Sequence, residues 1–190
     1  HPEGVDLLPS NIELSGMETG LFNVMSREYV LKNAIDGMKK NYDYILIDCM
    51  PSLGMMTVNA LVAADSVIIP SQPNFLSTKG LNLLLRSISK IKRQINPRLK
   101  IDGILLTLVD NRTNLAKSTV DAIRNNFGSV VKIYKAKIPM AVKAAEVTSK
   151  GKSIYAYEPN SKVALAYADF TKEVLSGGRQ KERLRSADAR

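Results

Sequence analysis

Apolar residues along the chain follow two alternating patterns. Short, continuous apolar runs are typical of strands covered on both faces, and longer stretches with apolar residues at helical spacing are typical of amphipathic helices. The alternation predicts an α/β fold with a mostly parallel sheet flanked by helices on both faces. The predicted strands are Val5–Leu8, Tyr44–Ile47, Ser66–Pro70, Ile101–Val109 and Val130–Tyr134. The predicted helices run from Ser26 to about Asn41, then over Met55–Ala64, Thr78–Ile95 (after a Ser77 cap), Leu115–Asn126, Ala141–Ser149 and Ser161–Leu175.

The chain divides into a folded part and a tail. Residues 1–175 are predicted to form one domain, because the length suits a single core and no internal repeat is present. Residues 176–190 begin Ser-Gly-Gly and continue as RQKERLRSADAR, a basic stretch predicted to be a disordered tail. The chain opens on His1 rather than on methionine, which suggests a fragment or a processed form.

The predicted strand Tyr44–Ile47 is followed at once by Asp48 and then by a turn from Pro51 to Gly54. Ligands of parallel sheets bind beyond the carboxyl ends of the strands. An aspartate there, next to a loop that moves, is how P-loop NTPases hold Mg²⁺ and sense a γ-phosphate. Aspartate also caps strands and begins turns, so these residues alone favour the two interpretations about equally.

The net charge of +9 favours polyanionic partners such as nucleic acid or anionic lipid. No acidic residue lies between Asp65 and Asp102, whereas seven basic residues do. Along the predicted helix Thr78–Ile95, one face is apolar and the opposite face is basic. Its basic residues are Lys79, Arg86, Lys90 and Arg93. Like charges four residues apart repel, so a face of one sign indicates contact with nucleic acid or an acidic partner as readily as simple solvation.

Polar and basic residues also follow two later strands. The polar string Asp110-Asn111-Arg112-Thr113-Asn114 comes just after the strand Ile101–Val109, where such side chains suit contact with a base or a backbone phosphate. A turn rich in Asp and Asn is the alternative. Pro139 marks a second junction between a strand and a helix, and Lys143 adds positive charge near it.

Several other chemistries find no support in the composition. The only histidine is His1, which excludes a Ser-His or Cys-His pair, and one cysteine with one histidine argues against a structural zinc or iron–sulfur site. Cys49 is predicted to be a small buried apolar residue, and a single cysteine fits a reducing cytoplasm. No apolar run approaches the ~20 residues that span a bilayer, and no secretory signal is visible.

Read in order, several segments resemble the ParA/Soj family of chromosome and plasmid partition ATPases, deviant-Walker P-loop NTPases of the MinD/ParA superfamily. The matching segments are LLPSNIELSG (7–16), SREYVLKNAI (26–35), YDYILIDCMPSLGMMTVNALVAADSVIIP (42–70), LTLVDNRTNL (106–115) and Ile138-Pro139. The resemblance extends from about Val5 to Leu175. It implies ATP and Mg²⁺ as cofactors, a nucleotide-sandwich homodimer, non-specific DNA binding, a ParB-type partner protein, and a cytoplasmic, nucleoid-associated location with no membrane contact.

The resemblance also implies roles for single residues at the nucleotide. Asp48 resembles the Walker B aspartate, which holds Mg²⁺ through water. The stretch from Pro51 to Gly54 resembles the switch loop that responds to the γ-phosphate. Asp110 and Pro139 fall where the family contacts adenine.

The resemblance also covers basic residues, and the sequence differs from the family pattern at a few positions. Arg112 and Lys143 match positions that the family uses against DNA, although Lys143 replaces an arginine and so lacks the planar fork. Met50 stands in place of the first switch-loop proline, and Met140 and Ala141 stand where the family has an arginine and an asparagine. Further candidates for DNA contact, from their charge, are Arg86, Lys90 and Arg93.

The family's Gly-rich phosphate loop has no counterpart here, because these 190 residues contain no G-x-x-x-x-G-K-[ST] sequence. That loop supplies a cradle of backbone N–H groups and the lysines that neutralise charge in phosphoryl transfer. The expectation is a fold that lacks its N-terminal strand and P-loop, and a chain that alone neither binds ATP tightly nor hydrolyses it. The alternatives are a non-enzymatic DNA-binding or dimerisation module, and a MinD-like membrane-cycling regulator, against which the tail's single apolar Leu184 argues.

Overall fold

The computed structural model describes residues 3–10, 13–50, 52, 54–110 and 112–188. The chain forms two compact units. Unit 1 comprises His1–Ser66 and Leu84–Lys100, and unit 2 comprises Val67–Leu83 and Ile101–Arg190. Helix α4 (Phe75–Gln94) contributes its first turns to unit 2 and its remaining turns to unit 1.

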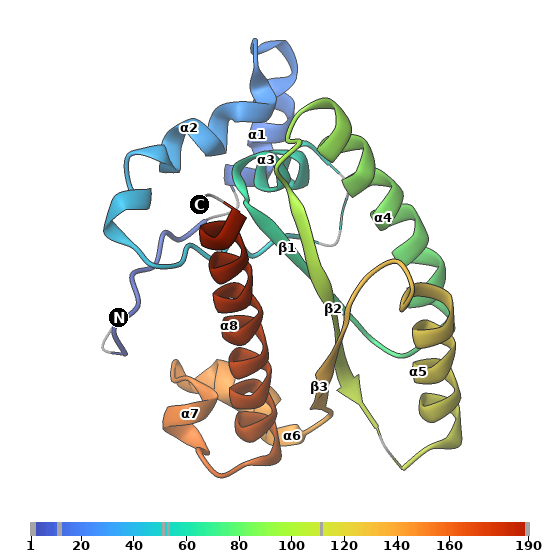
Figure 1. Ribbon diagram of the computed structural model, residues 1–190. Helices are drawn as coiled ribbons and strands as arrows, with labels where there is room; N and C mark the ends of the chain where they lie inside the picture. The colour runs from blue at the N-terminus through green and yellow to red at the C-terminus, as the bar shows by residue number, and fades with distance from the viewer. Residues whose placement is uncertain (1–2, 11–12, 51, 53, 111, 189–190) are drawn as a thin grey trace. The chain divides into compact units, whose positions relative to one another are not determined.

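Unit 1 consists of short helical segments, the later turns of α4 and one buried helix, α3 (Met55–Ala63), shown in Figure 1. The sequence of α3, MMTVNALVA, is almost entirely apolar, and six of its nine residues are buried. A helix that is apolar all round needs to be covered on several sides, which explains its place in the core of this unit. The other helical segments are α1 (Glu13–Gly20), η1 (Leu21–Asn23), η2 (Arg27–Tyr29), α2 (Val30–Asp36) and η3 (Lys39–Asn41).

Two asparagine side chains connect α3 to its neighbours in unit 1. Asn59 is only 3% exposed, and its Nδ2 donates to the carbonyl oxygen of Arg27 at 2.9 Å, while its Oδ1 accepts from the backbone N–H of Leu31 at 3.1 Å. Asn96, just after α4, donates through Nδ2 to the carbonyl oxygen of Leu61 at 2.9 Å. Buried polar groups are retained where they are hydrogen-bonded, so these amides fix the helices around α3.

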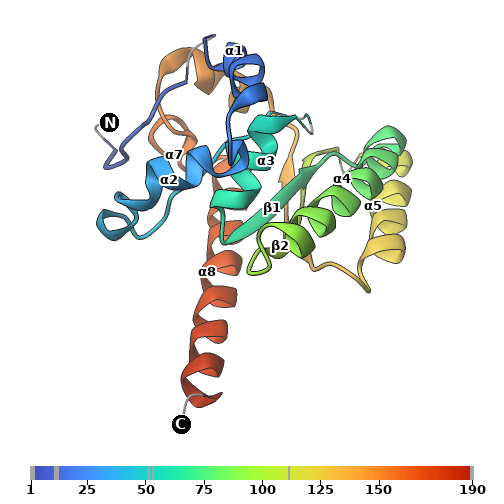
Figure 2. The same cartoon turned by 90° about the horizontal axis from the view of Figure 1, so that it is seen from above.

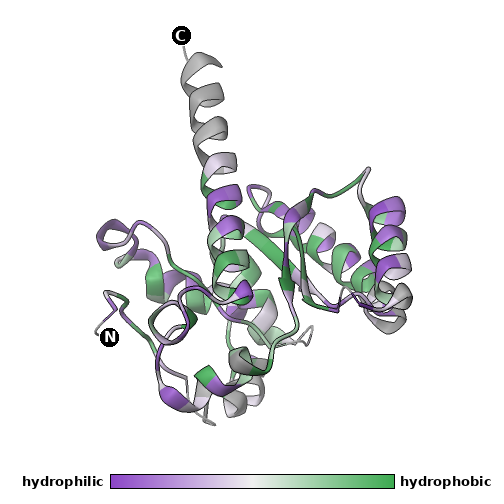
Figure 3. Cartoon of the chain, turned by 90° about the horizontal axis from the view of Figure 1, so that it is seen from below, coloured by the Kyte–Doolittle hydropathy of each residue, from purple (hydrophilic) through white to green (hydrophobic). Residues whose placement is uncertain are grey.

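The described residues of unit 2 are built on a sheet of three strands in the order β1-β2-β3, namely β1 (Ser66–Ser71), β2 (Lys100–Val109) and β3 (Ile133–Pro139). Strands β2 and β3 are parallel, and Val109 at the end of β2 is paired with Pro139 at the end of β3. The two strands therefore deliver the residues that follow them to the same edge of the sheet. Figure 3 shows hydrophobic colour concentrated on the strands, as expected for a sheet covered by helices.

Helix α8 (Lys162–Asp188) packs along β3 (Figure 1). Their shared core contains Leu105, Tyr134, Ile138 and Val163, and the Tyr134 ring meets Phe170 edge to face at 4.9 Å between centroids. Burial, followed by the charges of Asp102 and Glu173, raises the pKa of Tyr134 to about 12. The remaining elements are α5 (Asn114–Phe127), α6 (Val142–Val147), η4 (Thr148–Lys150) and α7 (Ile154–Tyr157).

Most predicted elements and the α/β fold class are confirmed. Helices α3, α4 and α5 and strands β1 and β2 lie within a few residues of the predicted bounds. The sequence missed α1 and α7. Helix α7 has only four residues, fewer than a helical period needs in order to be visible in a sequence.

Two predicted strands are wrong for the described residues. Val5–Leu8 and Tyr44–Ile47 form neither helix nor strand, and most of their apolar side chains are exposed. A strand exists only when a neighbour supplies hydrogen bonds along a ladder, and no described residue does so here. The apolar pattern indicated a tendency to be buried; it did not supply the partner.

The starts of two predicted helices and of one predicted strand also differ. Ser26 has φ 55° and makes no capping hydrogen bond, and Asn59 instead accepts the N–H of Leu31 in the first turn of α2. Helix α4 is capped by Asn74, whose Oδ1 accepts from the N–H of Ser77 at 2.8 Å. At the start of the predicted strand Val130–Tyr134, the N–H of Val131 donates back to the carbonyl of Phe127 at 2.8 Å, so the chain is still closing α5 and β3 begins later.

The end of α8 differs as well, because the helix does not stop at Leu175 but continues through Gly177 and Gly178 to Asp188 (Figure 2). Glycine disfavours a helix by about 1 kcal/mol per residue, which was the reason to expect a break. The following stretch RQKERLR consists of strong helix formers, and their preference outweighs the glycine pair. The assignment of residues 176–190 as a separate tail stays a prediction.

Candidate functional site

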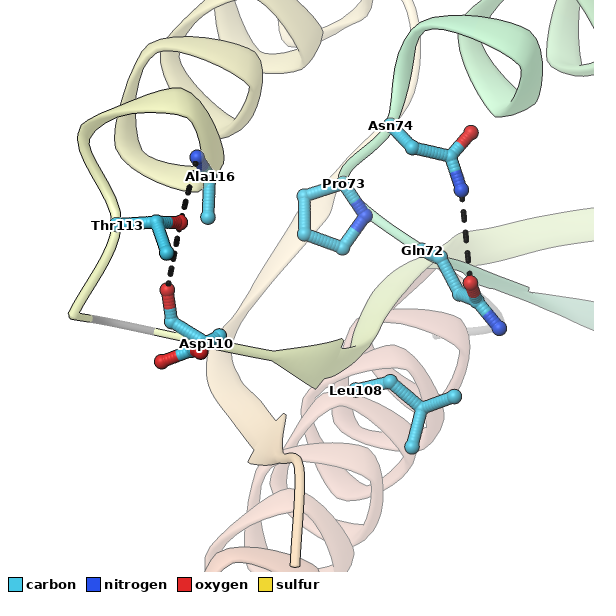
Figure 4. A pocket seen from close by; sticks show the side chains of 7 residues that line it. All are labelled: Gln72, Pro73, Asn74, Leu108, Asp110, Thr113 and Ala116. Carbon is cyan, nitrogen blue, oxygen red and sulfur yellow. Dashed lines mark hydrogen bonds between the residues drawn. The ribbon is translucent and has the colours of Figure 1, made fainter.

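Unit 2 has a shallow cavity at the carboxyl edge of its sheet, where ligands of parallel sheets bind (Figure 4). Its volume is about 210 Å³. The segment after β1 and the end of β2 supply its walls, and the lining residues are Gln72, Pro73, Asn74, Leu108, Asp110, Thr113 and Ala116. The lining combines three apolar residues, Pro73, Leu108 and Ala116, with four polar ones, and such a mixture is usual for a small-molecule site.

Leu108 has an unusual backbone conformation at this edge. Its φ is 52°, in the left-handed region that a residue with a side chain rarely adopts, and the pairing of β2 with β3 shifts register between Leu106 and Val109. A bulge of this kind bends the strand and re-aims a side chain. Leu108 is accordingly exposed at the cavity (Figure 4), although Val109, the next residue of β2, is buried.

Asp110 and Arg112, which the sequence assigned to different ligands, are bonded to each other. Arg112 donates through Nε to Asp110 Oδ1 at 2.9 Å and through Nη2 to Oδ2 at 3.0 Å, and its backbone N–H donates to Oδ1 at 3.1 Å. These hydrogen bonds, first that of the guanidinium and then that of the backbone, lower the pKa of Asp110 to about 2. The same pairing raises the pKa of Arg112. Both groups are therefore charged at neutral pH.

The loop after Asp110 leads directly into α5. Thr113 is the N-cap of this helix, and its Oγ1 accepts from the N–H of Ala116 at 3.2 Å. The same hydroxyl donates to the carbonyl oxygen of Asp110 at 3.4 Å (Figure 4). The cap thus fixes the start of α5 relative to the end of β2.

Pro139 lies at the same edge of the sheet as Asp110, which directly follows β2. It is the last residue of β3 and pairs with Val109, and the N–H of Met140 donates to the carbonyl of Val109 at 3.3 Å. The parallel pairing therefore brings together two residues that the sequence assigned to adenine contact. Lys143 lies in α6, and its side chain falls outside the described part of the structure.

Asp48 lies in unit 1, in a stretch without helix or strand that follows η3, and is exposed. Cys49 is exposed too, so its predicted burial is wrong: the segment that should have enclosed it is not in a sheet. Partial desolvation, followed by the charge of Asp48, raises the pKa of the Cys49 thiol. The next switch-loop residue of the prediction, Pro51, lies outside the described residues.

The chain after the switch region is anchored by α3. Gly54 is the N-cap of this helix, and its carbonyl oxygen accepts from the N–H of Val58 at 3.1 Å. Thr57 Oγ1 donates to the carbonyl oxygen of Ser52 at 2.5 Å. Because α3 is buried, it gives the far end of the loop a fixed attachment.

The described residues suit Mg²⁺ only as a partial site. They contain no group of three His, Cys, Asp or Glu side chains placed to hold a metal ion. Mg²⁺ commonly keeps several waters and uses one or two carboxylates together with substrate phosphates, so a single exposed Asp48 fits its needs when phosphates complete the shell.

The later part of α4, in unit 1, has a buried side and a basic side. Ile88 and Ile91 are buried, whereas Arg86, Lys90 and Arg93 are exposed. The amphipathic division predicted for this helix is confirmed. The role of the basic side in DNA contact stays a prediction.

Sequence reasoning missed two features of the site. The pairing of Asp110 with Arg112 was readable in principle, because an aspartate two residues before an arginine favours a local turn. The left-handed conformation of Leu108 could not be read from the sequence, since leucine has no preference for that conformation.

No helix among the described residues is long and apolar enough to cross a membrane.

Comparisons with known proteins agree with this arrangement. A model of the AAA domain family (AAA_31) matches residues 1–101. The sporulation initiation inhibitor protein Soj of Bacillus subtilis is 43% identical over 176 residues, which are 93% of this chain and 69% of Soj. The chromosome partitioning protein ParA of Caulobacter vibrioides is 38% identical over 181 residues, which are 94% of this chain and 67% of ParA.

Solved structures show the same fold. The chain superposes on a cobyrinic acid a,c-diamide synthase of Mycobacterium smegmatis, crystallised with ADP and magnesium, with a TM-score of 0.79 and 34% identity. The match covers 93% of this chain and 64% of the synthase. A plasmid partition protein of Borrelia burgdorferi, 21% identical, shares the fold with a TM-score of 0.68.

A parallel sheet flanked by helices, with P-loop NTPase neighbours, defines the class of protein. The chain belongs to the ParA/Soj family of partition ATPases within this class. It spans about two thirds of the length of these relatives, from 64% of the synthase to 69% of Soj.

Proposed function

We propose that these residues are the larger part of a ParA-type ATPase that acts in DNA segregation, with ATP-dependent dimerisation, non-specific DNA binding and a ParB-type partner on the nucleoid. The observation that supports this most directly is the similarity to Soj over 93% of the chain. It includes the Asp48 segment, the Asp110 loop and the Pro139 junction.

In this proposal the nucleotide contacts are divided between two stretches of the chain. Asp48 orients the water shell of Mg²⁺, which supplies charge neutralisation at the phosphates when bound. Residues from Pro51 to Gly54 respond to the γ-phosphate, and the buried α3 transmits their position. Asp110 and Pro139, paired at the ends of β2 and β3, contact the adenine base.

The DNA contacts in this proposal are basic and exposed. Arg112 is 87% exposed and follows the carboxyl edge of the sheet. Arginine side chains suit phosphate contact, which needs charge and donors but no reading of base edges. Lys143 and the basic side of α4 are further candidates, the latter comprising Arg86, Lys90 and Arg93.

We further propose that residues 1–190 alone do not hydrolyse ATP. They contain no phosphate-loop sequence, and phosphoryl transfer depends on that loop for positioning and charge. The same observation favours a second candidate function for this stretch by itself, a non-enzymatic DNA-binding or dimerisation module.

ATP turnover by the purified chain separates these candidates. We expect no phosphate release above the buffer rate with Mg²⁺ and duplex DNA, and DNA-stimulated release would show that the chain is an enzyme by itself. Gel shifts with and without ATP and Mg²⁺ give the second readout. Retardation of DNA that does not change with nucleotide supports the non-enzymatic module, and retardation that requires ATP contradicts the proposed lack of tight ATP binding.

A further inference from the structure

The ion pair joins Arg112, which is 87% exposed, to Asp110, which is 22% exposed, and it is unusually complete for a pair that reaches so far into solvent. Exposed ion pairs are commonly single contacts that contribute little, because two long side chains must be ordered in water. Here both carboxylate oxygens accept from the guanidinium, and the backbone N–H of Arg112 adds a third bond. A planar fork on a carboxylate is the stronger and more directional form of the pair.

The pair leaves Arg112 exposed but electrically balanced. A guanidinium has five N–H donors, of which Asp110 takes two, so three remain for another ligand. The side chain is 87% exposed, and these donors face solvent. The carboxylate next to it cancels the charge that would attract a phosphate, because the two groups together have no net charge.

We propose that Asp110 limits how strongly Arg112 binds a polyanion, by holding the guanidinium in a neutral pair at the carboxyl edge of the sheet. The inference rests on the proposed DNA contact of Arg112. It gives Asp110 a role toward DNA in addition to its expected place near adenine. Removing the negative charge of Asp110 increases the pull of Arg112 on phosphate, and it does so only while Arg112 is present.

A double-mutant cycle tests the proposal. Binding of a random-sequence DNA duplex is measured by fluorescence anisotropy for the intact chain, Asp110→Asn, Arg112→Ala and the double variant. Asp121→Asn, an exposed aspartate on α5, is the matched control for loss of one negative charge. Thermal unfolding followed by circular dichroism confirms that each variant is folded.

We expect Asp110→Asn to bind DNA about tenfold more tightly than the intact chain, and more tightly than Asp121→Asn. The gain disappears when Arg112 is alanine. The slope of log affinity against log salt becomes steeper by about one for Asp110→Asn, since one more cation is available to displace counterions. A gain that persists in the Arg112→Ala background, a gain equal to that of the control, or weaker binding by Asp110→Asn overturns the proposal.

A readout without DNA separates this inference from the proposed function. Carboxyl titration by NMR is expected to give Asp110 a midpoint near its lowered pKa of about 2, moving upward in Arg112→Ala. An unchanged midpoint shows that the pair is absent and overturns the inference. If the midpoint moves but Arg112→Ala binds DNA as the intact chain does, the proposed DNA contact fails, and the role of Asp110 fails with it.

Discussion

Two stretches of this chain look alike in sequence and differ in structure. Tyr44–Ile47 and Ile101–Val109 are both apolar runs that end in an aspartate, Asp48 and Asp110. The second run is the central strand of the sheet, and its aspartate is held by three hydrogen bonds from Arg112. The first is largely exposed and lies outside the sheet.

The difference lies in what surrounds each run. Leu106 in β2 is 0% exposed, because β1 and β3 flank it and helices cover it, whereas Leu46 is 91% exposed. An apolar run followed by aspartate therefore predicts only that the run tends to be buried. The position of the carboxylate is fixed only when neighbouring strands pair with the run. Asp48 follows a segment that pairs with no strand among the described residues, so no sheet fixes the position of its carboxylate.

The largest expected effect is a difference in the free energy of unfolding between alanine variants of Leu106 and Leu46. Leu106→Ala leaves a cavity in a closely packed core and should lower the free energy of unfolding by about 2–5 kcal/mol. Leu46→Ala removes an exposed side chain and should change it by less than about 0.5 kcal/mol. Urea unfolding followed by circular dichroism measures both. Equal losses would mean that the first run is packed as tightly as the second.

A smaller loss of free energy of unfolding is expected for a substitution in α3 of unit 1. Asn59→Ala removes the acceptor of the Leu31 N–H and the donor to the Arg27 carbonyl, and should destabilise the chain by about 1–3 kcal/mol. Asn125→Ala, at an exposed position of α5, is the matched control and should be nearly neutral. If both variants unfold at the same urea concentration, the amide does not hold α2 against α3.

The Asp110–Arg112 pair should also make the free energy of unfolding depend on pH in the acid range. The pKa of Asp110 in the folded chain, about 2, is below its ordinary value near 4, so the pair stabilises the fold above pH ~4 and this contribution is lost as pH falls toward 2. The stability difference between the intact chain and Asp110→Asn should therefore be constant from pH 7 to about 4 and shrink below it. Urea unfolding at a series of pH values measures this. A difference that stays constant to pH 2 contradicts the pairing.

The smallest expected effect concerns Cys49, next to the unpaired run. Its thiol should react with a disulfide reagent, because it is exposed, but more slowly than a free thiol, because its pKa is raised. Asp48→Asn removes the second of the two causes and should speed the reaction by less than about tenfold. No change in rate would mean that Asp48 does not lie beside the thiol.

Much of the fold could be predicted from the sequence, and several of the exceptions depend on tertiary partners. β2 and α3 are strongly apolar and were predicted nearly to their ends, because their patterns reflect burial that the structure provides. The predicted cap of α2 is wrong because a residue distant in sequence competes: Asn59 supplies to α2 the acceptor that Ser26 was expected to provide. Local propensity does not encode such tertiary partners.

The candidate site was predictable in its residues and less so in its geometry. The sequence placed Asp110 and Pro139 at strand ends, and the parallel pairing of Val109 with Pro139 brings those ends together. It did not foresee that Asp110 and Arg112 bind each other, because each was matched to a ligand separately. Their roles toward nucleotide and DNA stay predictions.

Backbone amide hydrogen exchange tests the comparison most directly. The N–H groups of Ile45 and Leu46 should exchange at nearly the rate of an unstructured peptide, since no ladder protects them. Those of Ile104 and Leu106 should exchange orders of magnitude more slowly, at rates set by opening of the whole sheet. If Tyr44–Ile47 proves as protected as β2, that run is a paired strand, and the contrast between the two aspartate-ending runs is wrong.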